Sequence, residues 1–364
     1  MKRLCLTPLA IMLLALSAWP VNALADKHTE PVPSETEIST MAPLARVIER
    51  NWQTWSKGSG TVSKLDMIAH MANPAYKGED AAALVALEKW LRKAGSIDRE
   101  NAIALQDPKI ISTYYSNVHK LKKVKRLLFA NGQPTFELLQ QGPPGDCYFF
   151  SGTGWMAFYR KQVIMDSIKQ RPDGRYDVIF PNGDSAIVDP PTDAELAIND
   201  STSTLQDGLW MSVLEKATGM ILSRTSSKSA DIPDYTVAID RGGVPIGSIV
   251  ERWTGKKPIL VLLGSRTNRD KVRKALIHMQ RYNLMSEALL LRKPPAKLAY
   301  NHVYAILGFD DTTDMVKIWN PWGTDFKPKG PSGAEFGYAR DKGVFFLPLA
   351  DFIDFYSVVA IEKR

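Results

Sequence analysis

One cysteine lies in a sequence context that suits covalent chemistry. A turn rich in glycine and proline begins at Gln141, and Cys147 follows this turn at the start of a predicted helix. The first turn of a helix carries unpaired N–H groups and the positive end of the helix dipole, so it favours the anionic form of a thiol. Cys147 is therefore a candidate nucleophile for attack on a carbonyl group.

A donor for the attacked carbonyl lies just before the cysteine. Gln141 precedes Cys147 by six positions and can direct its side-chain amide across the turn. Such an amide would donate to the oxygen that becomes negatively charged during attack. An oxyanion donor of this kind typically changes the rate by about 10²–10³-fold.

A thiol nucleophile also needs an imidazole, and His302 has the most suitable context of the five histidines. His28 lies in a polar N-terminal stretch, whereas His70, His119 and His278 fall in segments with helical spacing. His302 instead begins a predicted strand, where a sheet can hold the ring toward a cleft.

A third group is expected to orient the imidazole. Asn320 follows His302 by eighteen positions and ends the next predicted strand, in the sequence Asn-Pro-Trp-Gly. If the two strands are neighbours, Asn320 can accept a hydrogen bond from the ring and fix its tautomer. The sequence therefore predicts a Cys-His-Asn arrangement, with Gln141 as a fourth member.

The elements that would position these residues change in type along the chain. Residues 42–128 show mainly helical spacing of apolar residues. From residue 131 onward, short alternating runs predict strands, including a hairpin over 176–188 and two strands over 302–309 and 315–319. Helices are expected at 208–217 and 268–282. The pattern as a whole indicates an α+β protein.

The first helical segments flank a loop that resembles a calcium-binding loop in length. Residues 55–66 contain the central glycine of an EF-hand loop, but Trp55 and Lys57 occupy two of the ligand positions. Only Ser59 and Asp66 remain as oxygen donors, which is too few for calcium. We therefore expect a helix–loop–helix without calcium. The lysine-rich stretch 119–126 lacks aromatic platforms or a recognition motif, so nucleic acid is not an expected partner.

The N-terminus has the pattern of a secretory signal peptide. Lys2 and Arg3 precede an apolar run over residues 4–21 that ends in Ala-Leu-Ala, which predicts cleavage before Asp26. The run is interrupted too often for a membrane anchor, and no later stretch is long enough to span a bilayer. Cys5 would leave with this peptide, so Cys147 would be the only thiol of the mature chain. A secreted or periplasmic location follows.

Two motifs around the candidate residues resemble those of the calpain family of cysteine peptidases. Residues 141–147 match Gln-Gly-x-x-Gly-Asp-Cys, and residues 320–323 match Asn-Pro-Trp-Gly. The helical segment 209–217 and the C-terminal segment 345–355 are also similar to the family. Tyr148 and Asn301 depart from it, because the family usually has tryptophan and glycine there, and Ser151 and Gly152 replace a more apolar start of the helix.

The resemblance implies a papain-like core of two lobes, one helical and one β-rich, with a cleft between them. We expect a signal peptide at 1–25, a mainly helical N-terminal domain at 26–130 that serves as a propeptide or an accessory domain, lobe 1 at 131–235 and lobe 2 at 236–364. The implied activity is cleavage of peptide bonds in proteins or peptides, through a thioester on Cys147, with His302, Asn320 and Gln141 in the site.

The sequence leaves open whether calcium is required and whether the chain has one of two other functions. Calpains of animals are activated by calcium, but their ligands cannot be located in this sequence, which by itself requires no cofactor. The chain could instead be a non-catalytic binding protein on a peptidase scaffold, or an acyl transferase like the transglutaminases, which use aspartate as the third residue. Asn320 favours the peptidase. The sequence does not predict an oligomeric state.

Overall fold

The computed structural model describes residues 42–142, 145–198, 206–225, 245–264 and 266–364. The predicted signal peptide and its cleavage site lie outside these ranges. Within the described ranges, helices are all too short or too polar to cross a bilayer.

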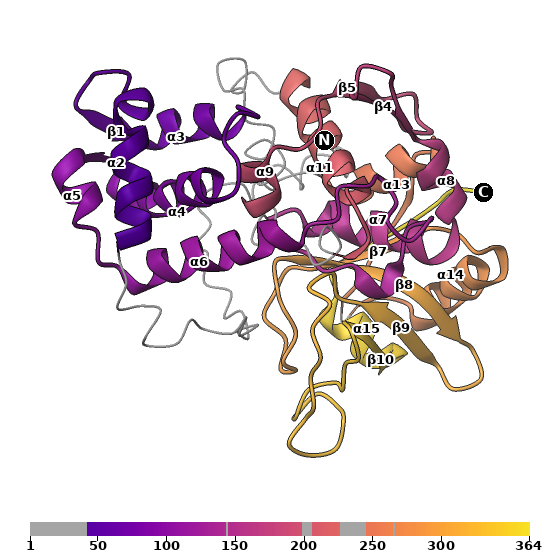
Figure 1. Ribbon diagram of the computed structural model, residues 1–364. Helices are drawn as coiled ribbons and strands as arrows, with labels where there is room; N and C mark the ends of the chain where they lie inside the picture. The colour runs from indigo at the N-terminus through magenta and orange to yellow at the C-terminus, as the bar shows by residue number, and fades with distance from the viewer. Residues whose placement is uncertain (1–41, 143–144, 199–205, 226–244, 265) are drawn as a thin grey trace, which may run out of the picture.

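Two helix–strand–helix units form the N-terminal part, shown in indigo and violet in Figure 1. They consist of α2 (Ala42–Ser56), β1 (Thr61–Ser63) and α3 (Lys64–Met71), followed by α4 (Glu79–Ala94), β2 (Ser96–Asp98) and α5 (Arg99–Ile103). Strands β1 and β2 pair antiparallel, with Val62 opposite Ile97. The helix–loop–helix predicted around residues 55–66 is therefore present.

The two oxygen donors left in that loop are used within the protein. Asp66 accepts the backbone N–H of Ser63 at 2.9 Å as part of a capping box that starts α3. The hydroxyl of Ser59 lies 2.7 Å from the backbone oxygen of Ser56 and 2.8 Å from that of Thr61. Both groups therefore stabilise the local chain.

Helix α6 (Pro108–Lys123) connects this part to the rest of the molecule. It begins with Asp107 as N-cap, whose side chain accepts the N–H of Lys109, and with proline at the first helical position. Its buried face packs against α4 and against α9 (Asp193–Ile198). Further contacts join the same regions, because Thr192 donates to the backbone oxygen of Met71 at 2.7 Å. The N-terminal helices thus share one hydrophobic core with the following segment.

Several helices and a small sheet follow, coloured from magenta to salmon in Figure 1. The elements are η2 (Phe136–Leu138), α7 (Cys147–Tyr159), α8 (Lys161–Asp166), β3 (Ile168–Gln170), β4 (Tyr176–Ile179), β5 (Ser185–Val188) and α11 (Trp210–Thr225). Strands β4 and β5 form the predicted hairpin, with Val178 opposite Ala186. The helix predicted over 208–217 is α11, which continues to Thr225.

The C-terminal part is an antiparallel six-stranded sheet with the order β10-β9-β8-β7-β11-β6. Its strands and covering helices are α13 (Ser248–Thr254), β6 (Ile259–Leu262), α14 (Arg269–Tyr282), β7 (Ser286–Leu290), β8 (His302–Asp310), β9 (Met315–Trp319), β10 (Val344–Pro348), α15 (Leu349–Phe355) and β11 (Val358–Ile361). The predicted strands at 302–309 and 315–319 are therefore correct, as is the helix at 268–282. The mixture of helices with antiparallel sheets confirms the α+β class.

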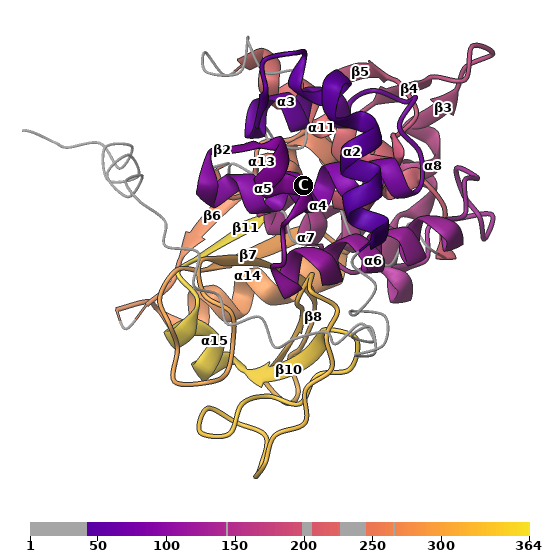
Figure 2. The ribbon, with the colours of Figure 1, turned by 60° about the vertical axis from the view of Figure 1, so that its left-hand side comes forward.

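Helix α7 lies closely against this sheet, and two small residues allow the approach. A Cβ atom on Gly154 would lie 2.1 Å from the ring of Trp319 on β9. One on Gly152 would lie 2.5 Å from Ile249 on α13 and 3.1 Å from Glu287 on β7. Gly152 is one of the departures from the family pattern noted above, and its place in the packing explains it. Figure 2 shows the strands of this sheet below the N-terminal helices.

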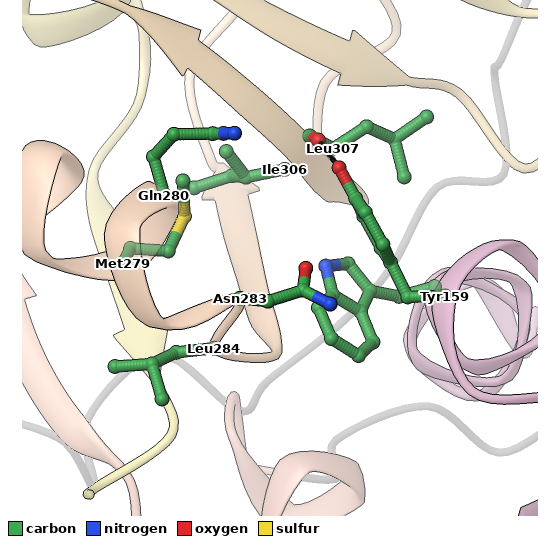
Figure 3. A pocket seen from close by; sticks show the side chains of 8 residues that line it. Tyr159, Met279, Gln280, Asn283, Leu284, Ile306 and Leu307 are labelled. Carbon is green, nitrogen blue, oxygen red and sulfur yellow. Dashed lines mark hydrogen bonds between the residues drawn. The ribbon is translucent and has the colours of Figure 1, made fainter.

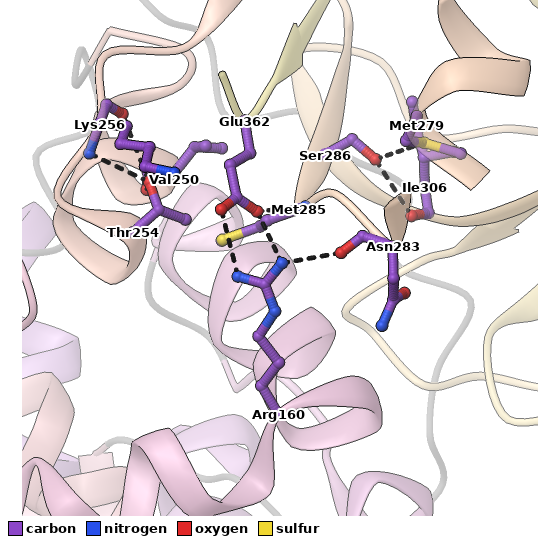
Figure 4. Close-up of polar contacts among 10 residues, drawn as sticks. All are labelled: Arg160, Val250, Thr254, Lys256, Met279, Asn283, Met285, Ser286, Ile306 and Glu362. Atoms are coloured by element: carbon purple, nitrogen blue, oxygen red, sulfur yellow. Dashed lines mark hydrogen bonds and ion pairs between the residues drawn. The ribbon is translucent and has the colours of Figure 1, made fainter. Parts of the chain in front are cut away.

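The end of α7 is tied to the sheet by polar contacts. Arg160 forms an ion pair with Glu362 at 2.8 Å and also donates to the backbone oxygen of Asn283 (Figure 4). Nearby, Tyr159 donates to the backbone oxygen of Leu307 beside a small gap (Figure 3). This gap holds only about 10 Å³, room for one water molecule at most. These contacts hold the segments that carry Cys147 and His302 together.

Candidate active site

Cys147 is the first residue of α7, as the sequence predicts. The residue is half-buried. The backbone N–H groups of Val303 and Tyr148 approach its sulfur. Val303 directly follows His302, and α7 packs on β8. The thiol therefore lies beside the start of β8, where the candidate imidazole is attached.

His302 is the first residue of β8 and is only 4% exposed. Its Nε2 atom lies 2.9 Å from Oδ1 of Asn320. Because Nε2 is used in this way, Nδ1 is the ring nitrogen left for a thiol. The ring also packs against Trp322 and Tyr304, each with a centroid distance of 4.8 Å.

Asn320 directly follows β9, and only 1% of it is exposed. Strands β8 and β9 are paired neighbours, so the adjacency expected for His302 and Asn320 is present. Its Oδ1 atom also accepts the backbone N–H of Trp322 at 3.0 Å. Two donors to one oxygen define which way the amide points, and the oxygen faces the ring.

Asn301, a departure from the family pattern, has a backbone reason. Its φ angle is +52°, in the left-handed region that glycine adopts freely and that asparagine tolerates better than most residues. The chain therefore makes the same turn into β8 with asparagine in place of glycine.

Gln141 is held next to the turn that follows Asn320. Its backbone N–H donates to the backbone oxygen of Pro321 at 2.8 Å. Its side-chain Nε2 donates to Oδ1 of Asp146 at 3.1 Å. The two sequence motifs, far apart along the chain, thus meet in space. All four predicted site residues lie in one region of the molecule.

Burial favours the neutral forms of both candidate catalytic groups. Desolvation raises the pKa of the Cys147 thiol to about 12, and the nearby charge of Asp146 adds to this, although the N–H groups of Val303 and Tyr148 act in the opposite direction. Desolvation lowers the pKa of His302 to about 4, against the effect of the Asn320 hydrogen bond. In this resting geometry, desolvation of the thiol therefore opposes the effect of the helix start.

Three buried ionisable residues near the site were not singled out from the sequence. Glu287 on β7 accepts the hydroxyl hydrogen of Ser151 at 2.7 Å, and Glu215 and Lys120 lie behind Asp146. Asp146 and Glu215 lie in segments that resemble the calpain family, and this resemblance is the sequence feature that could have pointed to them. Among the described residues, no three His, Cys, Asp or Glu side chains are grouped so that they could hold a metal ion.

Comparison with known families gives one match. The model of the calpain family cysteine protease matches residues 107–363, which includes α6 and all four site residues. None of the curated proteins compared with the chain matches it.

Proposed function

Because the chain belongs to the calpain family of cysteine proteases, we propose that it is a papain-like endopeptidase that uses Cys147, His302 and Asn320. The family supports cysteine peptidase activity on protein substrates. The observation that favours these three residues is the 2.9 Å contact between His302 and Asn320 beside the start of α7. The transglutaminase-like alternative is less well supported, since the third residue is an amide.

In the proposed reaction, the thiol proton moves to Nδ1 of His302 before the sulfur attacks the peptide carbonyl. This single transfer creates a thiolate and an imidazolium together. Opposite charges about 4 Å apart near a protein surface attract by about 4 kcal/mol, which offsets part of the desolvation that favours the neutral pair. The His302 proton then passes to the leaving amine, and water hydrolyses the thioester.

The oxyanion formed in each step would lie near the Gln141 side-chain amide and the backbone N–H of Cys147. Asn320 accepts the Nε2 hydrogen, so that Nδ1 is the nitrogen that exchanges the proton with sulfur. Trp322 packs on the ring and shields this hydrogen bond from water.

The proposal is tested by replacing Cys147 with alanine. The variant should lose hydrolysis of a denatured protein substrate while it keeps the thermal midpoint of the wild type. A Cys147→Ser variant is the matched control for the size of the side chain. Turnover retained by the alanine variant would exclude Cys147 as the nucleophile, and an inactive wild type would favour the non-catalytic binding protein.

The proposal extends to the organisation and location of the protein. We assign α7 and its neighbours to one lobe and the six-stranded sheet to the other. We assign the helices α2 to α5 to an accessory part that stays attached, because α3 and α4 contact α9. Export follows from the predicted signal peptide. Mass spectrometry of the purified protein would give the first residue of the mature chain, expected to be Asp26, and assays with a chelator would show whether calcium is needed.

A further inference from the structure

Two buried carboxyl groups lie directly behind the candidate nucleophile. Asp146 precedes Cys147 as the N-cap residue of α7 and has no exposed surface, although its side chain does not cap the helix. Glu215 lies on α11 and is 1% exposed. The side chain of Glu215 lies within hydrogen-bonding range of Asp146.

This contact requires a proton. Among the described residues, no N–H or O–H group donates to either carboxyl oxygen of Glu215. Two ionised carboxylates would repel at this distance, so one of the pair must be protonated. Burial first, and then the charge of Asp146, hold the pKa of Glu215 well above its usual range, while Lys120 from α6 acts in the opposite direction. Glu215 therefore carries the proton and donates it to Asp146.

An ionised Asp146 determines how Gln141 is oriented. A carboxylate can only accept hydrogen bonds, so the Gln141 amide must turn its nitrogen, and not its oxygen, toward Asp146. The observed contact is Nε2 of Gln141 to Oδ1 of Asp146, at 3.1 Å. The amide nitrogen carries two N–H groups, and an oxyanion would need only the other one. A flipped amide would present its oxygen to the developing negative charge.

From these contacts we infer that Glu215 and Asp146 are positioning residues, which hold the Gln141 amide with its nitrogen toward the oxyanion. The inference rests on the proposed peptidase function and deepens it. Lys120, on a helix outside the two motifs, is the nearby basic residue that acts on Glu215.

The charge of Asp146 also disfavours ionisation of the nucleophile Cys147. Its effect on the thiol can therefore be measured separately from its effect on the Gln141 amide. The charge of Asp146 raises the pKa of the Cys147 thiol. Replacement of Asp146 by asparagine removes that charge and should therefore favour the thiolate. Asparagine both accepts and donates, so the Gln141 amide could then turn either its nitrogen or its oxygen toward residue 146. Alkylation of Cys147 by iodoacetamide measures the thiolate alone, because displacement at a saturated carbon forms no oxyanion. Hydrolysis of a peptide amide needs both the thiolate and the oxyanion donor.

The test compares Asp146→Asn, Glu215→Gln and Gln141→Ala in the full chain. For Asp146→Asn we expect kcat for a peptide amide to fall about 10–100-fold, a part of the usual effect of an oxyanion donor, with alkylation of Cys147 at pH 6 as fast as in the wild type or faster. Glu215→Gln keeps a neutral donor to Asp146, so its kcat should stay within about threefold of the wild type. In the Gln141→Ala background, Asp146→Asn should cause no further loss, because both act through one amide.

Several results would overturn the inference. One is a kcat of Asp146→Asn within twofold of the wild type, and another is an equal slowing of hydrolysis and alkylation in that variant. A further loss of kcat when Asp146→Asn is added to Gln141→Ala would also overturn it. So would a loss of kcat in Glu215→Gln as large as in Asp146→Asn. If Asp146→Asn does not fold, Glu215→Met replaces it in the comparison with Gln141→Ala. This variant removes the proton donor Glu215 and leaves Asp146 in place. Because all rates are compared with an active wild type, an inactive wild type would refute the proposed function and not the positioning role alone.

Discussion

Replacement of Glu287 by glutamine should change how the stability of the protein depends on pH. Glu287 lies on β7 with no exposed surface and accepts the hydroxyl hydrogen of Ser151 from α7 at 2.7 Å. Burial raises its pKa from 4.5 to about 8, although hydrogen bonds from Ser151 and the backbone of Gly247 lower it in part. The folded protein therefore keeps a proton that the unfolded chain releases above pH 4.5.

The sign and size of the effect follow from this difference. The stability associated with protonated Glu287 is complete below pH 4.5 and is lost as pH rises toward about 8. The loss is roughly 1.4 kcal/mol per pH unit in this range. Glutamine is neutral at every pH and keeps an oxygen for Ser151. Relative to wild type, Glu287→Gln should therefore gain about 3 kcal/mol between about pH 5 and 7.5.

Urea unfolding at a series of pH values measures this gain directly. Groups that titrate in both proteins cancel in the difference between the two free energies of unfolding. Ser151→Ala is the matched control, because it removes the hydroxyl donor and leaves the carboxyl group. If the free energies of unfolding of wild type and Glu287→Gln run parallel from about pH 5 to 7.5, Glu287 does not hold a proton in the folded state and the reasoning is wrong.

Three further substitutions test the packing and the orientation of the imidazole. Asn320→Ala should lower kcat at least about 10-fold with a small change in KM, since the ring loses its tautomer-fixing acceptor; an unchanged kcat would contradict this role. Arg160→Met breaks a partly buried ion pair and should cost about 1–3 kcal/mol in urea unfolding, and a cost near zero would show that this tie between α7 and the sheet is unimportant. Gly154→Ala should cost at least about 1–3 kcal/mol, because the added carbon would lie 2.1 Å from Trp319, whereas Gly333→Ala, with open space around it, should be nearly neutral; similar costs for the two would contradict the close packing of α7.

Local features of the fold and the neighbourhood of the site were predictable from the sequence. The alternating runs on either side of residues 310–314 predicted β8 and β9, and their pairing brings His302 and Asn320 together. The glycine- and proline-rich turn predicted the start of α7 at Cys147. These features depend on residues close together in the chain, and period-2 patterns and turn residues report on such contacts well.

Other features depend on contacts that no local pattern encodes. The strand order places β11, the last strand, between β7 and β6, and no spacing in the sequence indicates this. The contact between Asp146 and Glu215 requires α7 and α11 to meet. The pKa of Cys147 is another example: the effect of the helix start can be inferred locally, whereas desolvation of the thiol comes from tertiary packing.

The most direct test of the account is to look for the thioester on Cys147. Wild-type protein mixed with a peptide ester or amide and quenched in acid within one turnover should show the acyl group on the peptide that contains Cys147, by mass spectrometry. The adduct should disappear as product forms and should be absent from His302→Ala. Product formation with no acyl group on Cys147 at any time would contradict the account.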